Sequence, residues 1–506
     1  MSSTKTIAKN TLFLYFRMIL VMGVSLYTSR IVLNTLGVED YGIYNVVGGV
    51  VVMFGFLNSS MATATNRFLS FEIGRKDYVR LANVFSMSVN IHIIIAVAIF
   101  ILAETIGLWF LNTQLKIPPS RFNAALWVYQ FSILSFMISI IRVPYNSMII
   151  AHEKMNIYAW IGILEVILKL VIVYLLQIAL YDKLKFYSVL TFSVTLLISL
   201  IYAIYCLRKF KEAKYKLYWE STLFKEVFSH SGWMLFGTTT NMLSTQGVNM
   251  LMNIFFGVTV NAARAIAYQI QAAVNTFVSN FMMAVNPQII KLYAQDDLES
   301  MYKLVFRSSR FSFYLLFIIA LPVLMLTETF LTWWLKIVPE FAVLFTRLTV
   351  VDLAFTVFYG PLATINQATG KIRSYQLMIT ILFSTIFITT FIAYKAGLPS
   401  YTAFIIMIVV SVIGVLARLL ILKRQINFSI YRYFKNVILR TSLVVLISIP
   451  IPLVLLINTN PGLMQFLIIG FASVISTILS VWLVGIERSE KIFFKQKIKL
   501  VLYKLK

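Results

Sequence analysis

The stretch TSRIVLNTLGVEDYGIYNVVGGVV, residues 28–51, shows how this chain is built. An apolar run that contains Arg30 stops at a short acidic turn, which holds Gly37, Glu39 and Asp40, and a second apolar run dotted with glycines follows. A turn without lysine or arginine between two such runs is typical of a hairpin of membrane-spanning helices that faces away from the cytoplasm. The stretch therefore predicts the first outer hairpin of a membrane protein.

The composition of the whole chain agrees with this interpretation. Of its 506 residues 60% are hydrophobic and 12% are charged, and the mean hydropathy is +0.85. Soluble chains have about 45–50% apolar and about 25% charged residues. Apolar stretches of about 20 residues cross a bilayer, and they recur along the chain. The sequence predicts an all-α polytopic membrane protein with about fourteen spans, at 11–33, 41–66, 85–111, 122–150, 156–180, 186–207, 232–256, 260–290, 310–336, 341–367, 375–396, 400–422, 437–457 and 463–486.

The distribution of positive charge predicts the orientation of these spans. The net charge is +25, and about three quarters of the 44 lysines and arginines fall in the two termini and in alternate loops. Cytoplasmic loops collect Lys and Arg, so we expect both termini to be cytoplasmic. The charge is a topology signal, and no nucleic-acid partner is expected. Basic segments such as the tail FFKQKIKLVLYKLK (493–506) are expected to bind anionic membrane lipids.

The chain also contains an internal repeat. When the second half is aligned on the first without a gap, Gly37 falls on Gly257 and Asn66 on Asn286, and further along, at a slightly smaller offset, Pro144 falls on Pro361. The matches agree in order and topology and predict two parallel six-helix repeats, which is a transporter architecture. The expected parts are an N-terminal half (1–207), a basic cytoplasmic linker (208–231), a C-terminal half (232–422), two further helices (423–486) and a basic amphipathic cytoplasmic tail (487–506).

Polar side chains concentrate in the first, second, seventh and eighth spans, which correspond in the two repeats. Each of them alone is explained by hydrogen bonds that join neighbouring helices, but a water-filled cavity between the halves explains the concentration of the group. Amides and hydroxyls match a sugar, and arginine matches phosphate oxygens. The predicted substrate-binding residues are Arg17, Arg30, Asn66, Thr239, Asn241, Gln246, Asn249, Arg264 and Asn275.

Charged residues inside the spans suggest where a coupling ion binds. Asp352 lies near mid-depth without a local partner, which suits a proton site and equally suits a pair with an arginine of another helix. Glu165 and Lys169 are spaced i,i+4 in the favourable order, so a neutralising pair is favoured over a coupling role for Glu165. Arg30 and Arg264 lie toward the outer ends of their spans and are expected to approach one another across the halves.

Residue patterns of known enzymes and cofactor sites are missing from the sequence. The single cysteine, Cys206, excludes an internal disulfide and a cysteine-based metal cluster, and the three histidines have no ligand-like spacing. The chain has no GxxxxGK[ST] phosphate loop, no HExxH motif and no large hydrophilic loop. We therefore expect no cofactor, no metal and no enzymatic activity.

The segments SRIVLNTLGVEDYGIYNVVGGVV (29–51) and NSSMATATNRFLSFEIGRKD (58–77), together with the fourteen spans, resemble a known family. They are similar to the bacterial polysaccharide flippases, which export O-antigen and capsule repeat units and belong to the multidrug/oligosaccharidyl-lipid/polysaccharide exporter superfamily. The resemblance implies a location in the inner membrane and a cavity between the first, second, seventh and eighth spans. It also implies alternating access, with an undecaprenyl-pyrophosphate-linked glycan as substrate and H⁺ or Na⁺ as the coupling ion.

Two other functions remain open at this point. One is a drug or organic-cation:ion antiporter of the same superfamily. The other is a non-transporting membrane scaffold for a glycan assembly complex. Aqueous labelling of cysteines placed along the seventh span separates the scaffold from the transporters, because only a transporter needs water there.

Overall fold

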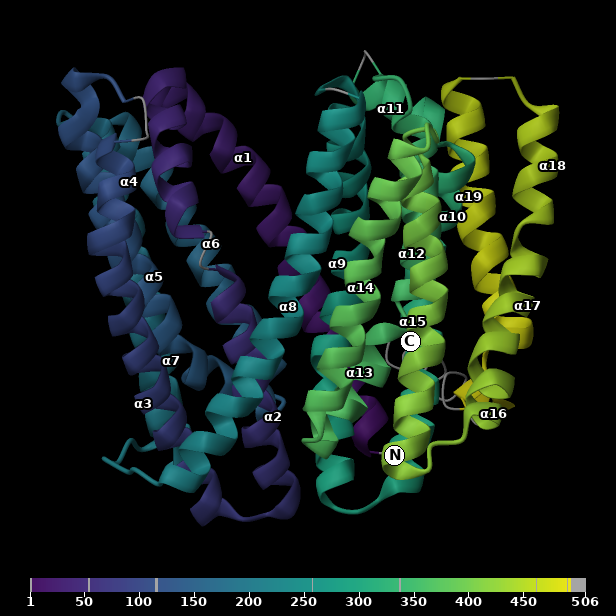
Figure 1. Ribbon diagram of the computed structural model, residues 1–506, viewed down its shortest axis with the longest axis horizontal. Coiled ribbons are helices and arrows are strands. Elements are labelled where there is room, and N and C mark those ends of the chain that lie inside the picture. Colours follow the sequence, from purple (N-terminus) through teal and green to yellow (C-terminus); the bar gives the residue numbers. More distant parts are fainter. Residues whose placement is uncertain are drawn as a thin grey trace, which may run out of the picture. The chain divides into compact units, whose positions relative to one another are not determined.

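The computed structural model describes residues 2–52, 55–113, 117–256, 258–335, 338–460, 462–488 and 490–492, and every regular element in these ranges is a helix (Figure 1). The chain divides into two compact units. Unit 1 contains Met1–Thr239 and Met283–Asp297, and unit 2 contains Thr240–Met282 and Leu298–Lys506. The two units are described separately below.

Unit 1 begins with a long helix that Gly37 divides. The φ and ψ of Gly37 are 81° and 167°, a backbone conformation that a residue without a Cβ adopts readily. This break separates the first predicted span from the second, as the sequence indicates. The helices of unit 1 are α1 (Ser2–Val52), α2 (Gly55–Arg75), α3 (Tyr78–Leu102), η1 (Ala103–Gly107), α4 (Leu108–Thr113), η2 (Pro119–Arg121), α5 (Phe122–Ala151), α6 (Met155–Gln177), α7 (Lys183–Lys209) and η3 (Lys211–Ala213).

Two helices run through the division between the units. In α8 (Ser221–Phe256) the residues up to Thr239 belong to unit 1, and in α9 (Val258–Ala294) the residues from Met283 onward belong to unit 1. Because α8 begins at Ser221, the predicted linker 208–231 overlaps the end of α7 and the first turns of α8.

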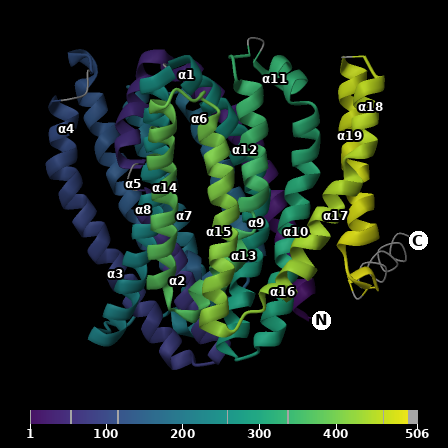
Figure 2. The ribbon, with the colours of Figure 1, turned by 45° about the vertical axis from the view of Figure 1, so that its right-hand side comes forward.

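Unit 2 holds the remaining helices. They are α10 (Leu298–Met325), α11 (Thr327–Leu335), α12 (Ala342–Thr356), α13 (Tyr359–Thr369), α14 (Ile372–Lys395), α15 (Thr402–Ile426), α16 (Ile430–Tyr433), η4 (Phe434–Ile438), α17 (Leu439–Ser448), α18 (Pro450–Asn458), α19 (Leu463–Ser480) and η5 (Val481–Gly485). Figure 2 shows α17 and α19 beside α10, with which both are in contact. The last two predicted spans are thus attached to the bundle through α10.

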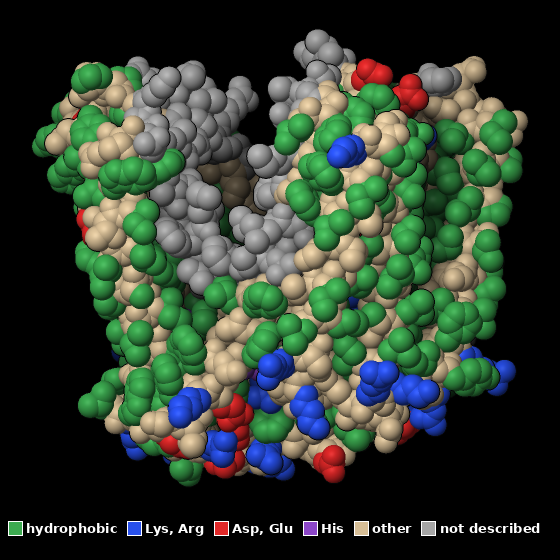
Figure 3. All heavy atoms as spheres, viewed as in Figure 1, with side chains coloured by type: hydrophobic (Ala, Val, Ile, Leu, Met, Phe, Trp, Pro, Cys, Tyr) green, Lys and Arg blue, Asp and Glu red, His purple; other side chains and the backbone are tan. Residues whose placement is uncertain are grey.

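Ten helical segments of the described chain are long and apolar enough to cross a membrane. The other four predicted spans fall on α1, α2, α8 and α9, which carry the polar residues predicted to bind substrate. On the face shown in Figure 3, Lys and Arg side chains gather toward the lower end of each unit and hydrophobic side chains cover the flanks. The all-α polytopic membrane fold predicted from the sequence is confirmed.

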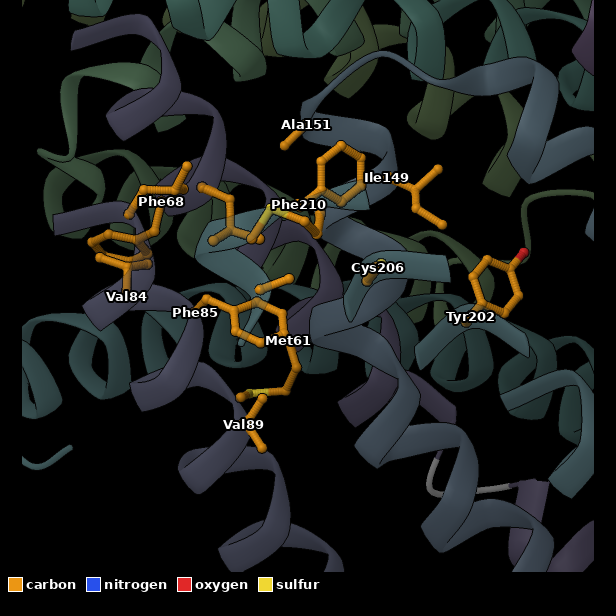
Figure 4. Close-up of a cluster of buried hydrophobic side chains, with 14 of the residues drawn as sticks. Met61, Phe68, Val84, Phe85, Val89, Ile149, Ala151, Tyr202, Cys206 and Phe210 are labelled. Atoms are coloured by element: carbon orange, nitrogen blue, oxygen red, sulfur yellow. The ribbon is translucent and has the colours of Figure 1, made fainter. Parts of the chain in front are cut away.

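A cluster of buried side chains holds α2, α3, α5 and α7 together in unit 1 (Figure 4). It includes Phe68, Phe85, Ile149 and Cys206, whose Sγ donates to the Tyr145 carbonyl at 3.3 Å. Since Cys206 is buried and hydrogen-bonded, it behaves as a small apolar core residue.

Tight turns recur at positions that the two repeats share. Lys76 and Asp296, which the alignment of the repeats places together, have φ angles of 60° and 58°. Glu153 and Gly370, which correspond in the same register as Pro144 and Pro361, have φ angles of 60° and 73°. The same left-handed backbone therefore occurs at helix connections that the predicted repeats pair, with glycine in only one of these four positions.

Candidate functional site

A cavity of about 470 Å³ opens within unit 2, between α9, α12, α13, α14 and α15. Its volume falls in the range of about 300–1,000 Å³ that small-molecule sites occupy. Its polar and aromatic lining includes Tyr268, Gln271, Asn275, Asp352, Tyr359 and Ser411. The wall therefore combines amides, hydroxyls, aromatic rings and one carboxylate inside a membrane-spanning bundle.

Asp352 is the acidic group of this cavity. Ser411 donates its hydroxyl to Oδ1 of Asp352 at 2.6 Å, and Tyr359 donates its hydroxyl to the Ser411 carbonyl at 2.8 Å. Among the residues that the structure describes, no Lys, Arg or His lies within 4 Å of the Asp352 carboxylate. Arg347 on the same helix is exposed. The sequence left open whether Asp352 is a proton site or pairs with an arginine of another helix. The described part of the structure contains no direct arginine partner for it.

Two arginines stand behind the tyrosines of the cavity wall. The guanidinium of Arg264, which is 6% exposed, lies 4.3 Å from the ring centroid of Tyr268. The guanidinium of Arg418, which is 4% exposed, lies 3.6 Å from the ring centroid of Tyr359. Each cavity tyrosine thus has a fixed cation against one ring face.

Arg418 was not predicted as a site residue. It stands close to the end of the predicted span 400–422, next to a basic loop, where an arginine is expected for topology alone. The signal that points to it is the segment SVIGVLAR (411–418), in which Ser411, Gly414 and Arg418 have the spacing of one helix face.

A second, smaller pocket of about 100 Å³ lies in unit 1 between α1 and α6. The guanidinium of Arg17 enters it and lies 4.6 Å from the Tyr158 ring. A Cβ on Gly162 would come within 2.1 Å of Nε of Arg17, so only glycine leaves room for this side chain. Lys169 and Glu165 form an ion pair at 2.7 Å at the edge of the pocket, which confirms the pairing predicted from their spacing.

The other predicted site residues are distributed over the two units. Asn66 lies in unit 1 and accepts a hydrogen bond from Ser70 at 3.2 Å, and Asn249 is half-buried on the part of α8 that belongs to unit 2. Asn275 and Asp352 meet in the unit 2 cavity. The side chains of Arg30, Thr239, Asn241 and Gln246 lie outside the described residues, so the expected approach of Arg30 to Arg264 stays a prediction.

An arginine holds three segments together at one end of unit 1. Arg121 donates from Nε and Nη2 to the carboxylate of Asp40 at 2.8 and 2.5 Å, and from Nη1 to Asp182 at 2.9 Å. Burial pushes the pKa of Asp182 upward, but hydrogen bonds from Arg121 and from the backbone amides of Leu184 and Lys185 hold that pKa below its ordinary value. Asp40 of the opening stretch therefore has a structural role in addition to the topology predicted from its turn.

A second polar cluster closes the opposite end of unit 1. The Glu153 carboxylate accepts hydrogen bonds from Gln288 and Lys291 of α9, and its carbonyl accepts one from Asn10 of α1 at 3.0 Å. Beside it, a Cβ on Gly74 would lie 2.8 Å from the Cβ of Ala294, so α2 and the end of α9 touch closely. The end of α9 that belongs to unit 1 is thus held by polar contacts within that unit.

A buried ion cluster in unit 2 was also missed by the sequence analysis. Arg310 of α10 is 1% exposed and donates to Glu487 at 2.9 Å, to Glu490 at 2.8 Å and to the Asn436 carbonyl at 3.0 Å. Glu490 also accepts from Arg307 at 2.9 Å. The segment after η5 is therefore anchored on α10 by charge.

The structure is thus that of a helical membrane protein with a polar cavity inside one of its bundles. Several solved structures have a similar fold. The structure described as MATE in the straight conformation has a TM-score of 0.72 at 14% identity, over 84% of this chain and 96% of that one. An outward-facing multidrug resistance MATE family transporter of the MOP superfamily has a TM-score of 0.68 at 15% identity, over 84% and 97%. A MOP superfamily transporter from Pyrococcus furiosus has a TM-score of 0.68 at 15% identity, over 83% of this chain and 96% of that one.

Residues 7–293, more than half of the chain, match the family model described as polysaccharide biosynthesis protein. The chain belongs to this family. No curated protein sequence matches it. This family agrees with the resemblance that the sequence shows, and the solved structures share the fold.

Proposed function

We propose that the protein flips lipid-pyrophosphate-linked oligosaccharide repeat units across the bacterial inner membrane by alternating access. The observation that carries the proposal is the unit 2 cavity, in which Gln271, Asn275 and Ser411 offer neutral hydrogen-bonding groups beside two tyrosines. Such groups suit a hydroxyl-rich ligand, since each sugar hydroxyl donates and accepts hydrogen bonds and each sugar face packs on an aromatic ring. Membership of the polysaccharide biosynthesis family supports the same substrate.

Arginines supply the part of the proposal that concerns the pyrophosphate. Arg17 and Arg264 are permanent cations inside the helical bundles of unit 1 and unit 2, and Arg30 is proposed to join them. Arginine binds phosphate oxygens through two parallel hydrogen bonds. In this proposal the headgroup passes the arginines while the undecaprenyl chain stays in the bilayer, with both termini of the protein in the cytoplasm.

Asp352 is the proposed coupling residue for H⁺ or Na⁺. Its carboxylate has a hydroxyl partner and no cation within contact distance in the described part of the chain, so a bound ion would meet no competing cation of the protein there. Glu165 is the weaker candidate because its charge is already paired with Lys169.

Glycan export by cells that depend on this protein tests the proposal. We expect Arg30→Ala and Arg264→Ala each to lower export at least about tenfold, because a charge-assisted hydrogen bond contributes about 1.5–3 kcal/mol and about 1.4 kcal/mol is a factor of ten. Arg347→Ala, which removes an exposed arginine of α12, is the matched control and keeps export. If both test variants export normally, the phosphate role is wrong.

Antiport of a drug or organic cation is the second candidate function. The isolated carboxylate of Asp352 beside Tyr268 and Tyr359 favours it, since carboxylates and aromatic rings bind cations. Efflux of a cation that Asp352→Asn abolishes and that Arg264→Ala leaves intact would establish antiport and exclude the flippase.

A further inference from the structure

We propose that Arg418 is a specificity-determining residue that keeps organic cations out of the unit 2 cavity. The proposal rests on the proposed function, because it explains how a cavity with an acid and two tyrosines serves a neutral, hydroxyl-rich ligand. It concerns one residue of α15 and its contacts within unit 2.

The contacts of Arg418 fix its guanidinium in one place. Nη1 donates to the Gly414 carbonyl at 2.9 Å and Nε donates to the Tyr375 hydroxyl at 3.1 Å. The charge lies 3.6 Å from the centroid of Tyr359 and 5.7 Å from that of Tyr375. No carboxylate among the described residues lies within 4 Å of Arg418. Its charge is therefore held by neutral groups and acts on the ring beside it.

Gly414 makes this arrangement possible. A Cβ at position 414 would lie 2.5 Å from the hydroxyl oxygen of Tyr359 and 3.0 Å from Nη1 of Arg418. A side chain there would separate the guanidinium from the ring. Ser411, one helical turn earlier on the same face of α15, joins the two residues to the acid, since its carbonyl accepts from Tyr359 and its hydroxyl donates to Asp352.

A tyrosine ring attracts a cation through the negative potential of its face. With Arg418 against one face of Tyr359, a second cation on the other face meets a positive charge across the ring. The repulsion is strong because the site is buried and poorly screened. Arg264 lies against Tyr268 in the same way. The two aromatic groups that would otherwise form a cation box with Asp352 are thus already occupied by cations that belong to the protein.

A neutral ligand meets no such repulsion. Its hydroxyls still find Gln271, Asn275 and Asp352, and its apolar faces still pack on the rings. The Arg418 guanidinium against Tyr359 therefore discriminates between charged and neutral ligands, and it leaves the hydrogen bonds between a neutral ligand and the cavity unchanged.

Binding of tetraphenylphosphonium to the purified full-length protein in nanodiscs, measured by equilibrium dialysis, tests the inference. We expect the wild type and Arg418→Lys, which keeps the charge, to bind this cation weakly. Arg418→Gln should bind it at least tenfold more tightly, and adding Tyr359→Leu to that variant should remove the gain. A loss of packing alone does not predict rescue by lysine or dependence on the tyrosine ring.

Two results overturn the inference. One is tight binding of tetraphenylphosphonium to the wild type, which needs no variant to fold. The other is unchanged weak binding by a folded Arg418→Gln, or by Arg418→Met if the glutamine variant does not fold. Glycan export by the wild type is measured in parallel. If the wild type exports glycan and the variants bind the cation no more tightly, only the role of Arg418 is overturned. If the wild type transports cations and does not export glycan, the proposed function is overturned.

Discussion

Glu153→Gln is expected to release the end of α9 from its contacts with Glu153 within unit 1. The carboxylate of Glu153 accepts from Lys291 and Gln288, and the side chains of Lys291 and Glu153 are 15% and 10% exposed. The variant removes the charge on Glu153 and leaves the Lys291 ammonium partly buried without its counterion.

The structure sets the size of the effect. A charge-assisted hydrogen bond contributes about 1.5–3 kcal/mol, and exposed pairs contribute about 0–1 kcal/mol. For this mostly buried pair we take about 2 kcal/mol, which corresponds to a roughly thirtyfold increase in the population of the released state at about 1.4 kcal/mol per factor of ten.

The assay follows the exposure of a buried position next to the cluster. Ala284 is fully buried against Leu14 and Met155. Ala284→Cys in a Cys206→Ala background places the only thiol of the chain there, and a water-soluble thiol reagent reports how often the position opens. We expect labelling to become roughly thirtyfold faster when Glu153→Gln is added, since the rate follows the open population.

Two further variants serve as comparisons for Glu153→Gln. Lys291→Gln should accelerate labelling to a similar extent. Glu299→Gln, which removes an exposed carboxylate paired with Arg432 in unit 2, should not change it. A labelling rate in Glu153→Gln within threefold of its parent, with the thermal midpoint unchanged, would show that the cluster does not hold α9.

Three further substitutions test other parts of the structure. Gly162→Ala should lower the thermal midpoint of the purified protein, because the new Cβ displaces Arg17 at a cost of about 1–3 kcal/mol; an unchanged midpoint would mean that the arginine moves freely. Glu490→Gln should destabilise by about 3–5 kcal/mol, since it leaves Arg310 incompletely paired, and Arg310→Met combined with Glu490→Met should destabilise less; the reverse order would refute this account. Arg121→Gln should destabilise at neutral pH and progressively less as the pH falls below the ordinary aspartate pKa of about 3.9, because the Asp182 carboxylate, whose pKa Arg121 helps to lower, stabilises the fold only while it is ionised; a loss independent of pH would exclude the ionic contribution.

The arrangement of spans is predictable from the sequence because it depends on local properties. An apolar run of about 20 residues identifies a span wherever it lies in the bundle, and Gly37 between two such runs marks a break. Asn275 and Asp352, which the sequence predicts as a substrate-binding and a coupling-ion residue, could be singled out for the same reason, since a polar group inside an apolar run is unusual in itself; both line the unit 2 cavity.

Partners distant in sequence were not predictable in this way. Glu153 meets Lys291 across 138 residues, and Arg310 meets Glu490 across 180. Nothing local distinguishes these residues from the other charges near span ends, which topology alone explains. Arg418 was missed for that reason, and only its spacing from Gly414 indicates a role inside the bundle.

The turn at Glu153 differs from the turn with which the predicted repeat pairs it. Its predicted counterpart, Gly370, adopts the same left-handed backbone without steric cost, whereas Glu153 adopts it with a Cβ present. At Glu153 the strained turn carries a carboxylate that binds Gln288 and Lys291 of α9. At Gly370 the turn is unstrained and has no side chain that could bind a neighbouring helix. The two connections therefore differ in how firmly they hold a neighbouring helix. Glu153→Gly would make them alike, because it removes the carboxylate that binds α9.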